Sequence, residues 1–197
     1  QGVIWTGSDD GIVHLTRDGG ATWQDVTPDA WGEVMVNEIA VSPHDPAVAY
    51  AAINRYKFND FTPIAYVTRD YGENWEEISD GFADEAWVHV VREDPRTPGL
   101  LYAGTETGIY VSFNGGDLWQ SLQLNLPNTP INDLIVHDRE NDLVVATSGR
   151  SFWILDDLSP LQQAARDVPD GDENSHHLYS PRHAYRLAGG SGFGGGG

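Results

Sequence analysis

The chain has 197 residues, with 30 acidic and 11 basic side chains, and its net charge of −19 would repel a phosphate backbone or an anionic membrane surface. It contains no cysteine, which excludes disulfides and thiolate metal sites, and no apolar run approaches the roughly 18 residues of a membrane span. We therefore expect no nucleic acid partner and no membrane span. Hydrophobic residues make up 40% of the chain, while 22 glycines and 11 prolines favour short strands joined by tight turns.

Lys57 is the single lysine, and the other basic residues are arginines. This balance is typical of proteins that work in high salt, and a genome that favours arginine codons explains it equally well. In the first case, folding stability should rise with salt concentration, because screening weakens the repulsion among the acidic side chains. A melting temperature that does not change between low and molar salt would remove that interpretation.

In chain order, the same set of short segments recurs. Hairpins are expected at residues 5–12, 102–109 and 145–152, and in the second unit within residues 50–70. The last three follow period-two strands that end in a turn, at residues 36–46, 88–95 and 131–138. A short strand follows at 24–26, 76–78 and 120–122. Each unit thus has four antiparallel strands. The second unit carries about eight extra residues at 55–62, which predicts one long loop.

An eight-residue motif lies between the third and fourth strands of each unit. Residues 16–23, 68–75 and 112–119 share the pattern Ser/Thr-x-Asp/Asn-x-Gly-x-x-Trp, and a degraded copy at 155–159 keeps only the acid. The acid positions of the four copies are Asp18, Asp70, Asn114 and Asp157. They lie 52, 44 and 43 residues apart, which matches the roughly 40 to 50 residues of one propeller blade.

The motif has a structural reason for each of its residues. A carboxylate or amide in a hairpin loop can accept the backbone N–H groups of its own turn, and glycine supplies the positive φ that such a turn needs. The tryptophans, Trp23, Trp75 and Trp119, are expected to fill equivalent buried positions between neighbouring hairpins. We interpret the acids as structural rather than catalytic.

Together, these residues resemble the Asp-box, or bacterial neuraminidase repeat. Repeats of this kind occur in sialidases, xyloglucan-degrading glycosidases, the propeller of a photosystem assembly factor and the sortilin receptor domain. Residues 55–57, 101–108 and 149–157 more closely resemble large secreted bacterial proteins described as sortilin-like or glycosyl-hydrolase-like. The resemblance covers residues 1–187 and implies an all-β fold, an arc of a β-propeller with four-stranded antiparallel blades. It also implies an extracellular or periplasmic location.

The segment after the fourth hairpin is less regular. Residues 158–166 read as a short helix or turn, and residues 167–177 as an acidic surface loop. Asp170, Asp172 and Asn174 have the spacing of the first calcium ligands of an EF-hand loop, but Ser175 and Pro181 replace the glycine and glutamate that the loop requires. We therefore expect no metal, and no cofactor. Residues 178–187 could add one more strand, and residues 188–197 form a glycine-rich linker.

A ligand is expected on the face of the propeller that does not carry the motifs. In a blade, the loop between the second and third strands shares this face with the crossing into the next blade. The residues placed there are Asp9, Trp31, Arg55, Tyr56, Lys57, Asp60, Trp87, Glu106, Asn128, Asn132 and Arg150. Aromatic rings beside planar donors and acceptors suit a glycan or a peptide. We single out Arg55, Tyr56, Lys57, Asp60, Trp87, Glu106 and Arg150 as ligand-binding candidates.

Other interpretations of these residues stay open. Trp31 and Trp87 could instead fill gaps between blades, and the arginines could pair with Asp60 or Glu106 to hold adjacent loops together. Glu106 and Asp133 could form an acid and base pair across a sugar bond.

Two classes of function follow, a binding or scaffold propeller and part of a glycoside hydrolase. The arginine triad and tyrosine–glutamate pair of sialidases, and the paired aspartates of xyloglucan-degrading enzymes, are not found. The first unit lacks an innermost strand, and rings close with four to eight blades. We therefore expect further blades upstream of Gln1, and an exposed apolar face that makes the isolated chain aggregate or pair with a second copy.

Overall fold

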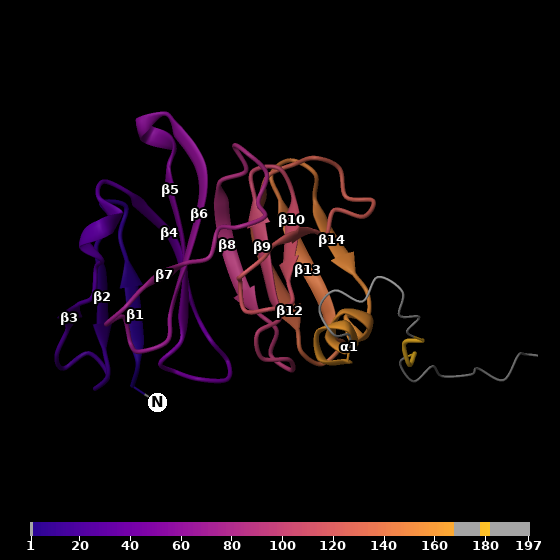
Figure 1. Cartoon of the computed structure of the whole chain (residues 1–197), viewed down its shortest axis with the longest axis horizontal. Helices are drawn as coiled ribbons and strands as arrows, with labels where there is room; N and C mark the ends of the chain where they lie inside the picture. Colours follow the sequence, from indigo (N-terminus) through magenta and orange to yellow (C-terminus); the bar gives the residue numbers. More distant parts are fainter. Residues whose placement is uncertain (1, 168–177, 182–197) are drawn as a thin grey trace, which may run out of the picture.

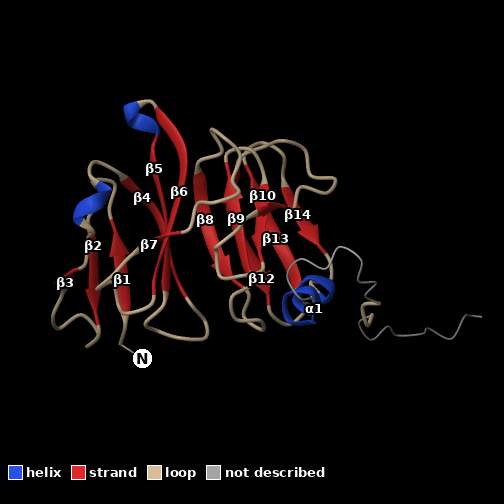
Figure 2. Cartoon of the chain, in the orientation of Figure 1, coloured by secondary structure: helices blue, strands red, loops and turns tan. Residues whose placement is uncertain are grey.

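The computed structural model describes residues 2–167 and 178–181. These residues form four small antiparallel sheets that follow one another along the chain and stand side by side (Figure 1). Strands dominate, with one α-helix and two short 3₁₀ helices (Figure 2). The predicted all-β fold of successive antiparallel blades is confirmed.

Within each sheet the strands pair in chain order. The first sheet contains β1 (Ile4–Gly7), β2 (Val13–Thr16) and β3 (Gln24–Asp25). The second contains β4 (Met35–Val41), β5 (Ala49–Arg55), β6 (Asp60–Thr68) and β7 (Glu76–Glu77), and the third β8 (Val88–Glu93), β9 (Leu101–Thr105), β10 (Ile109–Ser112) and β11 (Gln120–Ser121). The fourth contains β12 (Ile131–His137), β13 (Asp142–Thr147) and β14 (Phe152–Leu155). The 3₁₀ helices are η1 (Asp29–Trp31) and η2 (Tyr56–Phe58), and the α-helix is α1 (Ser159–Asp167).

The second and third sheets are complete four-stranded blades, whereas the outer two have three strands each. In the first sheet β1 to β3 correspond to β5 to β7, so the innermost strand is missing, as the sequence indicated. In the fourth sheet β12 to β14 correspond to β8 to β10, and no described strand pairs with the outer edge of β14. The helix α1 follows β14 and lies at the lower end of that sheet in Figure 1.

One hydrophobic cluster fills each of the three junctions between sheets. Leu15 and Trp31 lie in the first, Leu101 and Trp119 in the second, and Leu143 in the third. Because sheets two and three have a neighbour on each face, β5 and β9 are buried along almost their whole length. Burial between sheets is the main force that holds the blades together.

Among the described residues, no sheet covers the outer faces of the two end sheets, as expected for an arc. Ile4 of β1 is 44% exposed, and on β14 the exposed fractions of Phe152 and Ile154 are 77% and 60%. Such apolar residues are normally covered in a soluble domain when they lie together on a sheet.

The repeated motif has the hydrogen bonds that its chemistry requires. In the second copy, Thr68 Oγ1 donates to Asp70 Oδ1 at 2.9 Å, and Asn74 N donates to the same oxygen at 2.9 Å. Gly72 N donates to Thr68 Oγ1 at 2.8 Å, from a backbone with φ of +83°. The first and third copies repeat these bonds around Asp18 and Asn114. In the degraded copy, Asp157 Oδ1 instead accepts hydrogen bonds from Ser159, the first residue of α1.

The three motif tryptophans are not equally buried. Trp119 is 2% exposed and Trp75 is half-buried, but Trp23 is 46% exposed. Trp119 and Trp75 donate their indole hydrogens to the carbonyl oxygens of Ile78 and Val26, at 2.7 and 3.0 Å. Both acceptors belong to the preceding sheet. The prediction of three equivalent buried positions is therefore wrong for Trp23, because no sheet of this chain precedes the first.

Of the short helix or turn expected at residues 158–166, the structure shows the helix, α1. Leu158 is fully buried, and Gln162 Nε2 donates to Asp94 Oδ2 and Asn141 Oδ1 at 2.9 and 2.8 Å. Residues 178–181 contain no strand. The rest of the expected acidic loop, strand and linker, at 168–177 and 182–197, lies outside the described residues. Within the described part, no helix is long and apolar enough to cross a membrane.

Candidate functional site

The long loop predicted at residues 55–62 projects from the motif-free face, the side of the sheets that carries the β5–β6 loop and the crossings between blades. Figure 1 shows this loop extending beyond its neighbours, at the end of the sheets opposite the N-terminus. The helix η2 forms its tip, and Asn59 closes that helix in a left-handed conformation with φ of 58°. Asparagine tolerates this conformation better than most residues, which explains the tight return into β6.

An aromatic cluster lies at the base of this loop, between the second and third sheets. Trp87, just before β8, has its ring centroid 6.5 Å from that of Tyr56 and 5.3 Å from that of Phe61. The centroid of His89 lies 6.0 Å from Trp87. Trp87 and His89 are half-buried, and Tyr56 is 44% exposed. The cluster thus presents ring surface to solvent, unlike Trp31, which is 1% exposed and fills the junction between the first two sheets.

The charged residues of the long loop hold it to its neighbours. Arg55 donates to the carbonyl oxygen of Trp31 at 2.7 Å and lies 3.7 Å from the carboxylate of Asp60. Lys57 lies 4.0 Å from Asp9 in the first sheet's turn. Hydrogen bonds from Thr62 lower the pKa of Asp60, so that this carboxylate stays ionised. The structure therefore pairs Arg55 with Asp60, as one interpretation of the sequence proposed, and it also places Lys57 in a contact with the turn of the first sheet.

An open pocket of about 390 Å³ adjoins the aromatic cluster. Its lining residues are Asn59, Asp60, Phe61, Thr62, Pro63, Asp84 and Glu85. Three of these are carboxylates and none is basic, and no described residue forms an ion pair with Asp84 or Glu85. Phe61 belongs to both the pocket and the cluster, so ring surface and negative charge meet at one place.

A series of hydrogen bonds runs behind the aromatic cluster, through β4 and β8, the innermost strands of the second and third sheets. Asn54 Nδ2 donates to Asn37 Oδ1 at 3.1 Å, and Asn37 Nδ2 donates to His89 Nδ1 at 3.2 Å. Since Nδ1 accepts, the ring hydrogen is on Nε2, which donates to Glu106 Oε2 at 2.9 Å. These hydrogen bonds orient the Glu106 carboxylate and connect the second and third sheets.

The positions of Asn37 and His89 follow from a β-bulge that recurs in every inner strand. The pairing register shifts between Val36 and Glu38 in β4, between Val88 and Val90 in β8, and between Ile131 and Asp133 in β12. The residues left unpaired are Asn37, His89 and Asn132. Bulges redirect side chains and are common beside functional sites.

A second polar cluster joins three inner strands. Arg92 forms ion pairs with Glu38 of the preceding sheet and, at 3.0 Å, with Asp133 of the following one. Burial raises the pKa of Glu38, because desolvation outweighs the nearby Arg92 charge.

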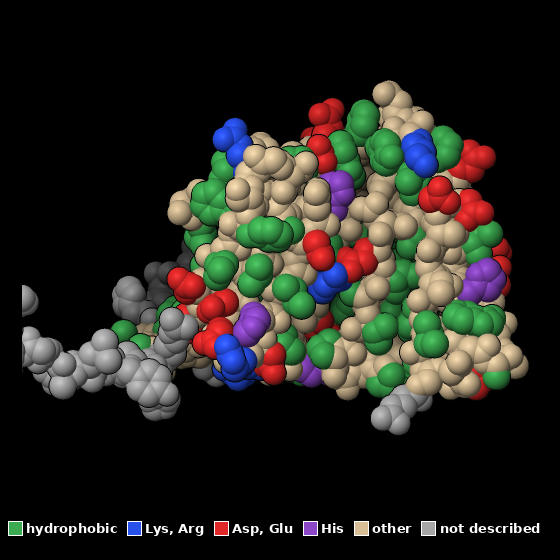
Figure 3. Space-filling view, turned by 180° about the vertical axis from the view of Figure 1, so that it is seen from behind, with side chains coloured by type: hydrophobic (Ala, Val, Ile, Leu, Met, Phe, Trp, Pro, Cys, Tyr) green, Lys and Arg blue, Asp and Glu red, His purple; other side chains and the backbone are tan. Residues whose placement is uncertain are grey.

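Figure 3 shows acidic side chains outnumbering basic ones on the face that it views. Within the described residues, no three His, Asp or Glu side chains are placed to hold a metal ion.

The candidate residues from the sequence are thus only partly gathered. Tyr56, Trp87 and Glu106 lie around the junction of the second and third sheets, whereas Arg150 is exposed in the β13–β14 turn of the fourth. The two acids proposed as a catalytic pair each contact another side chain: Glu106 pairs with His89, and Asp133 pairs with Arg92. Sequence reasoning missed Asn37 and His89. The available signal was a polar residue at the same point of each apolar inner strand, at positions 37, 89 and 132.

Comparisons with known proteins agree on the architecture. No model of a protein family matches the chain, and no curated protein matches its sequence. Among solved structures, YCF48 bound to D1 peptide is similar with a TM-score of 0.58 at 19% identity, over 78% of this chain and 48% of that one. YCF48 from Cyanidioschyzon merolae gives 0.54 at 20% identity, over 78% and 49%. The GH74 enzyme of Niastella koreensis gives 0.62 at 17% identity, over 80% and 27%.

These likenesses concern the fold, because identities this low carry no functional detail. The chain spans about half the length of the YCF48 structures and about a quarter of the GH74 enzyme. It is a β-propeller arc built from antiparallel blades, with an aromatic and acidic site at the junction of its two complete blades.

Proposed function

We propose that this chain is the binding part of a β-propeller scaffold, and that its motif-free face binds a peptide segment through a basic side chain. The observation that carries the proposal is the pocket of three carboxylates that Phe61 shares with the aromatic cluster, in which Phe61 and Trp87 are half-buried and Tyr56 is exposed. The repeats suggest an Asp-box propeller of the sortilin-like type, in a parent protein that is secreted.

A cation suits both halves of this site. A guanidinium or ammonium group can donate hydrogen bonds to Asp84 and Glu85, whose carboxylates are exposed and have no ion-pair partner among the described residues. The same group can lie over the face of an aromatic ring, an interaction worth about 0.5 to 2 kcal/mol. The net charge of −19 would accelerate the approach of a basic partner at low ionic strength.

A peptide with a basic side chain is favoured over a neutral glycan because the pocket offers three carboxyl groups and no basic donor. Sugar hydroxyls need donors as well as acceptors, whereas a basic side chain needs acceptors alone. The likeness to a YCF48 structure bound to a peptide adds a precedent for peptide binding on this fold.

The second candidate function is part of a glycoside hydrolase. It is favoured by one observation, the two carboxyl groups of Glu38 and Asp133 held on the same side chain, Arg92, with burial raising the pKa of Glu38, since such enzymes use a pair of carboxyl groups. The likeness to GH74 enzymes is consistent with it. Incubating the chain and its full-length parent with a panel of glycans, and measuring released reducing ends, tests this candidate directly.

The binding proposal is tested by fluorescence anisotropy with labelled pentapeptides. The probe is Gly-Ser-Arg-Ser-Gly, compared with the same peptide carrying Ala or Glu in place of Arg. We expect saturable binding of the Arg peptide that weakens with added salt, and at least about tenfold weaker binding of the other two.

Two variants locate the site on the chain. Trp87→Ala and Asp84→Asn should each reduce the affinity about fivefold or more, since they remove a ring contact and an acceptor. Asp117→Asn removes the same charge from an exposed position on the motif side, and should leave the affinity within about twofold. Equal affinity for all three peptides, or equal losses in Asp84→Asn and Asp117→Asn, would contradict the proposal.

A further inference from the structure

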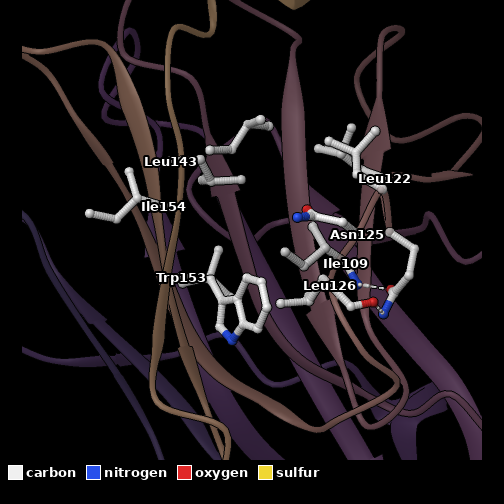
Figure 4. Close-up of a pocket in the computed structure, with 11 residues that line it drawn as sticks. Ile109, Leu122, Asn125, Leu126, Leu143, Trp153 and Ile154 are labelled. Carbon is white, nitrogen blue, oxygen red and sulfur yellow. Dashed lines mark hydrogen bonds between the residues drawn. The ribbon is translucent and has the colours of Figure 1, made fainter.

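The junction between the third and fourth sheets has a pocket where the other two junctions have a tryptophan. Its lining residues are Ile109, Leu122 to Leu126, Leu143, Val145 and Trp153 to Leu155. Figure 4 shows the ring of Trp153 pointing toward Ile109 and Leu126, while Ile154 extends to the other side of its strand. The pocket is therefore apolar and lies between the outer part of one blade and the strands of the next.

The repeat identifies what is missing from this pocket. Val26, Ile78 and Leu122 occupy the same position after the outer strand of successive sheets. The carbonyls of the first two accept the indole hydrogens of Trp75 and Trp119. The corresponding residue of the fourth copy is Gln162, which is directed into hydrogen bonds with Asp94 and Asn141 instead. The place beside Leu122 thus has the surroundings of a motif tryptophan without the tryptophan.

The adjacent strand also has an open edge. In the second and third sheets a two-residue strand pairs with the third strand, through Tyr66 with Glu77 and Tyr110 with Ser121. Trp153 occupies the corresponding position of β14, and no described strand pairs with its outer side. Unpaired strand edges bind extended segments by adding them to the sheet, and neighbouring side-chain pockets provide the specificity.

We infer that β14 and this pocket bind an extended segment of a partner chain that begins with tryptophan and has an aliphatic residue three positions later. The segment runs antiparallel to β14 and completes the fourth blade. Its indole enters the pocket and donates to the carbonyl oxygen of Leu122, as Trp75 and Trp119 do at the other junctions. The pattern Trp-x-x-aliphatic is that of residues 23–26, 75–78 and 119–122, each of which supplies the outermost strand of its own sheet.

Binding requires a small rearrangement at the mouth of the pocket. The enclosed space is about 50 Å³, enough for a water molecule and less than an indole. Leu124 lines the pocket, is 70% exposed and has a φ of 44°, a conformation that is unfavourable for leucine. Because Leu124 is poorly packed and strained, it can move outward to admit the ring.

The test uses the 197-residue chain and a fluorescein-labelled heptapeptide with the sequence of residues 117–123, Asp-Leu-Trp-Gln-Ser-Leu-Gln. Anisotropy should show saturable binding. Replacing the peptide's Trp by Ala should weaken binding at least about tenfold, because a buried indole is a typical binding hot spot. Replacing the Gln that follows the Trp by Pro should weaken binding as strongly if the segment pairs as a strand. Leu122 N donates to Ile109 O, so Gln120, two residues earlier, directs its N–H toward the same strand, and proline lacks that N–H.

A variant of the chain locates the site. Leu122→Trp fills the pocket from within and should abolish binding of the heptapeptide, whereas Leu118→Trp adds the same residue at an exposed position and should leave it unchanged. Circular dichroism establishes that both variants keep their strands. The inference is overturned if the heptapeptide does not bind, if the Ala or Pro peptide binds as tightly as the original, or if a folded Leu122→Trp variant binds it normally.

Discussion

The indole hydrogen of Trp119 is donated to the carbonyl oxygen of Ile78 at 2.7 Å, across the junction of the second and third sheets. Trp119 belongs to the motif of one blade and Ile78 to the end of the preceding blade. The ring of Phe82, in the crossing between the two blades, stacks on the indole with centroids 4.9 Å apart. The second and third motifs therefore stabilise their own hairpins and also join their blades to the one before.

The first prediction follows from this connection. Trp119→Ala should lower the free energy of unfolding by about 4 kcal/mol, because it leaves a cavity and an unpaired carbonyl between two blades. Trp23→Ala at the equivalent position of the first motif should change it by less than about 1 kcal/mol, because no sheet of the chain covers that side chain. Urea denaturation of both variants measures the difference, and equal losses would contradict the role assigned to the junction.

A second prediction concerns Gly81, whose backbone lies against that of Trp119. Gly81 has a φ of +99°, and a Cβ built there would lie 2.2 Å from Trp119 O. Gly81→Ala should therefore destabilise the chain by about 3 kcal/mol or more, through a clash with backbone as well as conformational strain. Gly19 has a φ of +75°, but a Cβ built there would have no atom within 4 Å. Gly19→Ala should therefore lower the free energy of unfolding by only about 1 kcal/mol. Thermal denaturation that ranked the two equally would show that the close approach is absent.

The third prediction concerns acid. Hydrogen bonds from the side chain and then the backbone of Asn74 lower the pKa of Asp70 below its ordinary value of 3.8. The folded state then binds protons less readily than the unfolded state, so the stabilisation is present above that value and is lost as the pH falls below it. Asp70→Asn keeps an acceptor oxygen, as Asn114 does in the third motif, and cannot titrate.

Between pH 6 and pH 2.5, the unfolding free energy of Asp70→Asn should therefore fall less than that of the unsubstituted chain. Asp117→Asn, at a motif position that makes none of these bonds, is the control and should follow the unsubstituted chain. Chemical denaturation at a series of pH values gives the three curves. Three parallel curves would mean that the motif carboxylate does not contribute to acid stability.

The fourth prediction concerns the pair of Arg92 with Glu38. The pKa of Glu38 is raised in the folded state, so its ionisation weakens folding as the pH rises through its ordinary value of 4.5. Arg92→Gln removes the charge that offsets this effect. The free energy of unfolding should fall by about 2 kcal/mol at pH 7, and by clearly less at pH 4, where Glu38 is protonated. Arg139→Gln, which removes an exposed ion pair with Glu140, should change stability little at either pH.

The sequence predicted most where the chemistry is local. The motif bonds of Asp70 join residues at most four positions apart, so pattern and spacing were sufficient to place the hairpins and the blades. The exposure of Trp23 was predicted wrongly because it depends on a neighbouring sheet, which the motif does not encode. The pairing of Arg92 with Glu38 joins residues of different blades, and no local pattern indicates it.

The candidate site shows the same limit. Tyr56 and Trp87 were predicted to share a face because loop positions follow from strand order, and the structure places their rings together. His89 was missed because an alternating strand pattern assigns such a residue simply to solvent. Its orientation depends on a bulge, and the recurrence of polar residues at 37, 89 and 132 is the trace that the bulge leaves in the sequence.

Amide hydrogen exchange with and without the peptide Gly-Ser-Arg-Ser-Gly tests most directly whether the motif-free face is the binding surface. At saturating peptide, exchange should slow in residues 55–62 and 83–89, which form the acidic pocket and the aromatic cluster. It should not change in the motif loops at 17–22, 69–74 and 113–118. Protection of the motif loops, with none at 55–62 and 83–89, would contradict the proposed function.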